Sequence, residues 1–269
     1  MRVLIVSDME GITGISVWEQ VNGGAPLYEE GRRLYTADVN AVVRGCKRAG
    51  AQQVTVIDWH GAGGFYSFKS LIPEKLERGA RYVLGAPYLR YVEPLEQGCD
   101  AALFVGFHAM AGTPDGVLSH TVSAEQWVSA ELNGQPAGEI ALVAALCGTW
   151  NVPVVFVSGD EAACREARAV LGESLHTAAV KKGLGRFAAV HLAPEDAHTL
   201  LEETACAALT SGTLPEPLCP SPVTLRVHLH TPEAVQSYVG KVGVEIEDSR
   251  TVAALGTTFW ELWERFARR

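Results

Sequence analysis

Two acidic side chains follow the first apolar run of the chain. Residues 3–6 form a short unbroken apolar segment, and Asp8 and Glu10 come soon after it, with Gly11 behind them. Such a run is typical of a buried strand in a parallel sheet. Side chains two residues apart on an extended chain project to the same side, so both carboxylates are placed to bind a hard cation. The alternative is that Asp8 caps a turn and Glu10 is solvated.

Two further apolar segments lead to histidines. Residues 54–57 precede His60, and residues 101–107 precede His108. One histidine after a strand is more often a capping or packing residue than a ligand. Ligands of open α/β sheets, however, collect beyond the carboxyl ends of the strands, and coincidence at three strand ends is harder to accept. The mixture of carboxylate and imidazole suits zinc or manganese.

Another carboxylate, Glu139, stands at the first turn of an expected apolar helix. One tetrahedral zinc ion needs fewer ligands than this set provides, so we predict a two-metal site with Asp8 as the bridging carboxylate. His120 follows a Gly/Pro loop beyond His108. It is either a further ligand or a general acid/base, since its ordinary pKa is about 6.5; the alternative is a surface-loop histidine. Asp58 is a candidate to orient His60.

Apolar periodicity predicts the elements that position these residues. Strands are expected over residues 3–6, 54–57, 101–107 and 154–157, and helices over residues 28–49, 140–150 and 161–171. Asp160 is the expected N-cap of the last of these helices. Residues 127–132 with Asn133-Gly134 predict an antiparallel hairpin. The pattern is that of an α/β fold with a mostly parallel sheet flanked by helices.

The alternation of strands and helices loosens after Gly172. We therefore expect a metal-binding α/β domain over residues 1–172 and a smaller α+β lobe over residues 173–269. The smaller lobe is the candidate region for oligomerisation. The proline-rich residues 211–222 are the best linker candidate. The aromatic residues 259–266 have helical spacing, which predicts core packing or a subunit interface rather than a cofactor site.

Composition excludes several classes of function. The 269 residues carry a net charge of −9, which argues against binding to nucleic acid. The six cysteines are scattered without a C-x-x-C pair, so they are interpreted as packing residues. There is no leader-like segment and no apolar run approaching about 18 residues, so we expect neither secretion nor membrane insertion and place the protein in the cytoplasm.

At these positions the chain resembles the zinc-dependent D-aminopeptidases encoded with bacterial dipeptide-transport operons. The resemblance is carried by five blocks over about the first 160 residues: Ser7-Asp8-Met9-Glu10-Gly11, Asp58-x-His60, Gly106-Phe-His108-Ala109, Thr113-Pro-x-Gly116-Val-x-Ser119-His120 and Asn133-Gly-x-Pro136-x-Gly138-Glu139. Each block alone is weak, and together they are specific. The chain differs in having Trp59 where the family often has a small residue, and Asp115 as an apparent extra loop residue.

This resemblance implies that Asp8, Glu10, His60, His108 and Glu139 bind two zinc ions, with Asp8 bridging, and that His120 is the catalytic histidine. It further implies a two-domain α/β chain that assembles into a homo-oligomer, a decamer of two stacked rings. The implied activity is removal of N-terminal D-residues, above all D-alanine, from short peptides.

The first hypothesis is therefore a dinuclear zinc aminopeptidase in which a metal-bound hydroxide attacks the scissile carbonyl and His120 stabilises the oxyanion or moves a proton. A second hypothesis is a metal-dependent amidohydrolase that acts on another small amide or a peptidoglycan fragment. A third is a non-enzymatic peptide- or metal-binding protein. Chirality of the substrate rests on the resemblance alone.

Overall fold

The computed structural model describes residues 1–85 and 91–267. Part of the segment 88–97, which the sequence leaves ambiguous between helix and loop, therefore lies outside the described residues. The remainder of that segment contains the short helix α2 (Glu93–Glu96).

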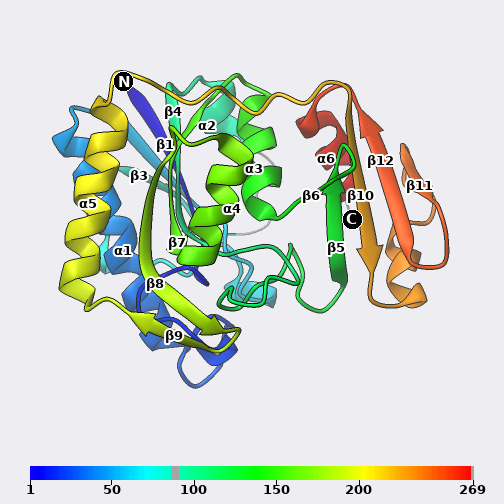
Figure 1. Cartoon of the computed structure of the whole chain (residues 1–269), viewed down its shortest axis with the longest axis horizontal. Coiled ribbons are helices and arrows are strands. Elements are labelled where there is room, and N and C mark those ends of the chain that lie inside the picture. Colours follow the sequence, from blue (N-terminus) through cyan, green and yellow to red (C-terminus); the bar gives the residue numbers. More distant parts are fainter. Residues whose placement is uncertain (86–90, 268–269) are drawn as a thin grey trace.

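A seven-stranded sheet forms the larger part of the molecule, in the order β3-β2-β1-β4-β7-β8-β9 (Figure 1). Neighbouring strands are parallel except for β9, which runs antiparallel to β8 at one edge. The expected α/β fold with a mostly parallel sheet is confirmed. The strands are β1 (Arg2–Ser7), β2 (Gln53–Asp58), β3 (Arg81–Val83), β4 (Ala101–Phe107), β7 (Val154–Asp160), β8 (His176–Gly185) and β9 (Ala188–His191).

A second sheet of five antiparallel strands has the order β11-β12-β10-β5-β6. The expected hairpin is present, because β5 and β6 pair across the Asn133-Gly134 turn. The strands are β5 (Trp127–Leu132), β6 (Gln135–Pro136), β10 (Val223–Leu229), β11 (Val244–Ile246) and β12 (Thr251–Gly256).

The helices form two layers, one on the outer face of the large sheet and one between the two sheets (Figure 1). In Figure 1, α1 (Tyr28–Arg48) and α5 (Pro194–Thr210) lie on one face of the large sheet, while α3 (Glu139–Gly148) and α4 (Glu161–Leu171) lie between the two sheets. All ten residues of α3 are buried, as expected of a helix that is apolar on every side. The C-terminal α6 (Phe259–Ala267) packs near the second sheet, and the short 3-10 helices are η1 (Trp18–Gln20), η2 (Gly64–Tyr66), η3 (Pro73–Lys75) and η4 (Pro232–Tyr238).

The two sheets do not divide the chain at residue 172, where the sequence analysis placed a boundary. Strands β8 and β9 and helix α5 belong to the large sheet and its covering layer, whereas the β5–β6 hairpin, from the first part of the chain, joins the small sheet. The continuous apolar runs of the buried strands are missing after residue 172, because β8 and β9 are partly exposed. The proline-rich segment does connect the layers, from the end of α5 to β10.

Within the described residues, none of the helices combines the length and the apolar character needed to cross a lipid bilayer.

The loop after β1 is held against β4 by direct main-chain contact. Asp8 N donates to Val105 O at 2.8 Å, and Gly11 N donates to Gly106 O at 2.7 Å. A Cβ atom on Gly11 would lie 2.0 Å from the Phe107 carbonyl oxygen, so only glycine permits this approach. The position of the acidic loop is therefore set by the backbone of the neighbouring strand.

Replacing Gly11 by alanine should lower the free energy of unfolding by at least about 2 kcal/mol, because the added methyl group forces the two backbones apart. Gly61→Ala is the matched control, since a Cβ there meets no atom within 4 Å. Urea denaturation of both variants measures the difference. Equal stability of the two variants would contradict the close contact between this loop and β4.

Candidate metal centre

The predicted ligands meet beyond the carboxyl ends of three adjacent strands. β1 lies between β2 and β4, and the order of strands reverses at β1 and β4, which makes this edge a topological switch point. Asp8 and Glu10 follow β1, His60 follows β2 and His108 follows β4. All four residues are at most 4% exposed. The parallel topology thus brings together residues that are 100 positions apart in the sequence.

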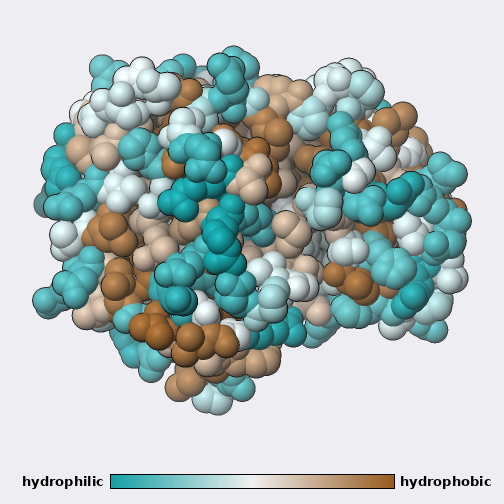
Figure 2. Space-filling model, viewed as in Figure 1, coloured by the Kyte–Doolittle hydropathy of each residue, from teal (hydrophilic) through white to brown (hydrophobic). Residues whose placement is uncertain are grey.

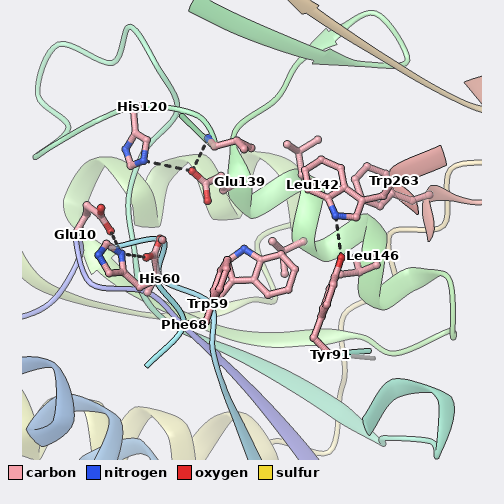
Figure 3. Close-up of a pocket in the computed structure, with 15 residues that line it drawn as sticks. Glu10, Trp59, His60, Phe68, Tyr91, His120, Glu139, Leu142, Leu146 and Trp263 are labelled. Atoms are coloured by element: carbon pink, nitrogen blue, oxygen red, sulfur yellow. Dashed lines mark hydrogen bonds and ion pairs between the residues drawn. The ribbon is translucent and has the colours of Figure 1, made fainter. Parts of the chain in front are cut away.

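Asp8 lies between two histidines that come from opposite neighbours of β1. Its Oδ1 is 2.9 Å from His60 Nδ1, and its Oδ2 is 3.5 Å from His108 Nε2. Glu10 Oε2 lies 3.3 Å from the same His60 nitrogen, as the dashed lines of Figure 3 indicate. Each oxygen of Asp8 therefore faces a different imidazole, the arrangement required of a carboxylate that bridges two metal ions.

Glu139 reaches the centre from the first turn of α3. Its Oε1 accepts a hydrogen bond from Val122 N at 2.7 Å and lies 3.2 Å from His108 Nε2. His120, on the loop that returns from β4, has its Nε2 3.7 Å from the same oxygen (Figure 3). The rings of His108 and His120 stack with centroids 4.0 Å apart. All six residues that the sequence singled out are therefore brought together.

Each of the three histidines is oriented by a backbone carbonyl. His60 Nε2 lies 2.9 Å from Val21 O, His108 Nδ1 lies 3.0 Å from Ala109 O, and His120 Nδ1 lies 2.9 Å from Leu118 O. A carbonyl only accepts, so these nitrogens carry the hydrogens. The other nitrogen of each ring is directed at the carboxylates, which is how ligating histidines are usually held in metalloproteins.

Burial and mutual charge shift the pKa values of the cluster. Burial, together with Glu10, raises the pKa of Asp8 to about 7. Burial alone would lower the pKa of His108, but the nearby carboxylates, Glu139 foremost, raise it to about 10. The same competition, with Glu10 and Asp8 as the opposing charges, raises the pKa of His60 well above its usual value.

The pKa values of the remaining three members of the cluster are lowered. Burial tends to raise the pKa values of Glu10 and Glu139, yet the histidines hold both below their usual values. Burial and His108 lower the pKa of His120, so its imidazole is neutral. The carboxylates thus attract positive charge into the cluster, and a divalent cation meets the same electrostatic demand.

The unsatisfied atoms of the cluster fit a metal. Glu10 Oε2 and His108 Nε2 are buried and make no hydrogen bond of normal geometry, although charged neighbours lie 3.3 and 3.2 Å away and buried polar atoms are nearly always paired. Donor atoms of Asp8, Glu10 and His108 lie within 4.8 Å of one another, and so do those of His108, His120 and Glu139. Carboxylate and imidazole donors in this number fit zinc.

Asp58 contributes through the backbone rather than through the imidazole of His60. Its Oδ1 accepts from His60 N at 3.2 Å, and its Oδ2 accepts from Ser70 N at 2.5 Å and Leu71 N at 3.1 Å. The expectation that Asp58 orients His60 therefore takes a different form: the carboxylate fixes the loop that carries the ligand. Asp160 is the N-cap of α4, as predicted, and accepts from Ala163 N at 2.7 Å.

Sequence reasoning missed Lys181, which holds the acidic loop from the other side. Its Nζ donates to the carbonyls of Glu10, Ile12 and Ile15 at 2.6 to 2.8 Å, and the side chain is 2% exposed. Burial lowers the pKa of Lys181 to about 8. The lysine lies 171 residues from Glu10, in strand β8, which β4 and β7 separate from β1. No local sequence motif indicates this role.

A cavity of about 350 Å³ extends from the metal centre. Asp8, Glu10, His60, His120 and Glu139 line one end of the cavity. The aromatic C-terminal segment packs in the core, as predicted, but it also reaches this cavity, which sequence reasoning missed. Of the two departures from the family pattern, Trp59 lines the cavity, whereas Asp115 is paired with Arg165 at 2.6 Å.

Comparison with known proteins identifies close relatives. A family model described as D-aminopeptidase, Peptidase_M55, matches residues 1–267. A curated D-aminopeptidase of Bacillus subtilis (strain 168) is 34% identical over 224 residues, which cover 82% of this chain and 78% of the relative. A solved structure described as the Zn-dependent D-aminopeptidase DppA from Bacillus subtilis, a self-compartmentalizing protease, superposes with a TM-score of 0.91 at 31% identity, covering 99% of this chain and 96% of the other.

Replacing Lys181 by methionine should lower the free energy of unfolding by at least about 2 kcal/mol, because three buried carbonyls lose their donor. It should also reduce the zinc content, since the loop that carries Asp8 and Glu10 loses its anchor. Lys182→Met is the matched control, because Lys182 is exposed on the same strand. Denaturation and metal analysis compare the two. A Lys181→Met protein as stable as the control would show that the contacts to the loop contribute little.

Proposed function

The chain belongs to the D-aminopeptidase family Peptidase_M55, and from this membership we propose that it is a dinuclear zinc aminopeptidase that removes N-terminal D-residues, such as D-alanine, from short peptides. Asp8, Glu10 and His60 would hold one zinc ion, and Asp8, His108 and Glu139 would hold the other. The printed description of the solved relative as Zn-dependent supports the choice of metal.

The position of Asp8 is the observation that carries the proposal. Its two oxygens face His60 and His108, and each of these imidazoles is fixed by a backbone carbonyl on its far side. A structural carboxylate would need only one partner. Two separate sets of donors that share Asp8 are the economical explanation for five buried ligands.

Zinc ions held there would polarise the scissile carbonyl and lower the pKa of an attacking water. The residues of the chain perform the remaining tasks. The carboxylates at this end of the cavity favour the positively charged α-amino group of a peptide over a blocked terminus. Their burial excludes bulk water, which strengthens that attraction.

His120 is suited to accept and return a proton. Its Nδ1 hydrogen points to Leu118 O, so the lone pair on Nε2 faces the site, and burial next to His108 keeps the ring neutral. A neutral imidazole at hydrogen-bond reach of the reacting groups is a general base, and its protonated form can then donate to the leaving amine. We assign His120 this role rather than that of a ligand.

The proposal includes a homo-oligomer, a decamer in its most specific form, and a cytoplasmic location. Apolar side chains are exposed around the β8–β9 turn, where Leu184, Phe187 and Val190 are 67%, 53% and 59% exposed. Figure 2 shows apolar residues gathered on the part of the surface where Figure 1 places β9. Such patches mark protein contacts, which fits the relative described as self-compartmentalizing.

Zinc-loaded protein should release alanine from D-Ala-D-Ala and not from L-Ala-L-Ala, and a chelator should abolish the release. Chromatographic detection of free alanine measures both reactions, with the chelated protein as control. Release from neither peptide, with two zinc ions bound per chain, would instead favour a metal-dependent amidohydrolase that acts on another small amide. Release from both would contradict the stereochemical part of the proposal.

Replacing His120 by alanine should reduce kcat at least about 100-fold while the zinc content stays the same, because a proton carrier and not a ligand is lost. His230→Ala is the control, since His230 is exposed and directly follows β10, away from the cavity. Steady-state kinetics and metal analysis are read together. Loss of zinc from the His120→Ala protein would move His120 into the ligand set and overturn its assigned role.

A further inference from the structure

The metal centre occupies only one end of the cavity. Beyond it, the walls are formed by Trp59 and Phe68 from the loop after β2, by Leu142 and Leu146 from α3, and by Trp263 from α6 (Figure 3). Apart from the residues of the metal centre, no described residue that lines the cavity carries a charged side chain. This apolar compartment has no part in holding metal, so its chemistry bears on the substrate.

One stripe of α3 ties the apolar compartment to the metal centre. Glu139, Leu142, Val143 and Leu146 are spaced by three or four residues, so their side chains lie on one face of the helix. At a rise of 1.5 Å per residue, Leu146 is about 10 Å along the helix from Glu139. Leu142 is only about 4.5 Å along the helix from Glu139, and a residue of a peptide spans about 3.5 Å, so a side chain next to the scissile bond reaches the near part of this compartment.

Contacts between aromatic rings fix the outer wall. Trp263 Nε1 donates to the Tyr91 hydroxyl at 3.0 Å, and the Trp59 and Tyr91 rings meet edge to face with centroids 5.1 Å apart. Trp260 makes a similar contact with Tyr91 at 5.6 Å. These residues come from three distant parts of the chain. The compartment is therefore formed before a ligand enters, which reduces the entropic cost of binding.

We propose that this compartment selects peptides with a bulky apolar side chain, preferably aromatic, on a residue that flanks the scissile bond. The inference rests on the proposed aminopeptidase activity and narrows its substrate class. An aromatic side chain would be buried there and would pack against the rings of Trp59, Tyr91 and Trp263. A charged side chain there would lose its hydration without gaining a partner. The substrate would thus join a free α-amino group at the acidic end with an apolar group about one residue away.

The test compares kcat/KM for D-Ala-D-Ala, D-Ala-D-Phe, D-Phe-D-Ala and D-Ala-D-Glu with the zinc-loaded protein. At least one of the two phenylalanine peptides should be cleaved about 10- to 100-fold more efficiently than D-Ala-D-Ala, the range typical of a filled apolar pocket. Which of the two is favoured identifies the side of the scissile bond that the compartment binds. D-Ala-D-Glu should be the poorest substrate if the leaving residue occupies it.

Two variants alter the apolar compartment without changing a residue of the metal centre. Trp59→Ser opens the wall, and Leu146→Trp fills the far end of the cavity; both should reduce the ratio of kcat/KM for the favoured phenylalanine peptide to that for D-Ala-D-Ala about 10-fold or more. Phe65→Ala is the control, because Phe65 is 93% exposed and does not line the cavity. If Leu146→Trp fails to fold, Trp59→Ser alone decides.

Failure of this inference differs from failure of the proposed function. Cleavage of D-Ala-D-Ala as efficient as that of both phenylalanine peptides would overturn the inference and leave the aminopeptidase activity intact. Absence of any cleavage would overturn the proposed function. In that case the same dipeptides serve as ligands, and titration calorimetry with the zinc-loaded protein decides. Binding of a phenylalanine peptide at least about 10-fold tighter would support the compartment, whereas equal affinities would overturn it.

Discussion

The contact of Asp8 with two histidines from different strands is the constraint on which the site depends. It requires β1 to lie between β2 and β4 with all three parallel, because only then do the residues after each strand meet at one edge. It also requires a glycine behind the acidic pair, where the loop touches the backbone of β4. Topology and one close backbone contact thus determine the geometry of the whole centre.

Several carboxylates buried together are electrostatically unfavourable unless positive charge compensates them. Here, His60 and His108 supply that charge from the strand ends, and Lys181 adds a buried ammonium group behind the loop. Helix α3 links the two functional regions, since it carries Glu139 at its first turn and the leucines of the apolar compartment on the same face. The acidic and apolar ends of the cavity therefore have fixed relative positions.

Local patterns singled out the side chains that the structure brings together, because most of these candidate ligands follow an apolar strand or begin an apolar helix. They could not reveal Lys181, whose partners lie 166 or more residues away, or the hydrogen bond between Trp263 and Tyr91, which joins residues 172 positions apart. The boundary predicted at residue 172 does not coincide with a division between the sheets, because β8 pairs with β7 and β9 completes the same sheet. Sequence periodicity indicates which face of a helix or strand is buried, but it does not indicate which other element covers that face.

We propose that Asp8 bridges two zinc ions. Anomalous diffraction at the zinc absorption edge, from crystals of the zinc-loaded protein, locates the ions. We expect two peaks per chain, one beside Glu10 and His60 and the other beside His108 and Glu139, with Asp8 in contact with both. A single peak, or a second peak that Asp8 does not touch, would contradict it.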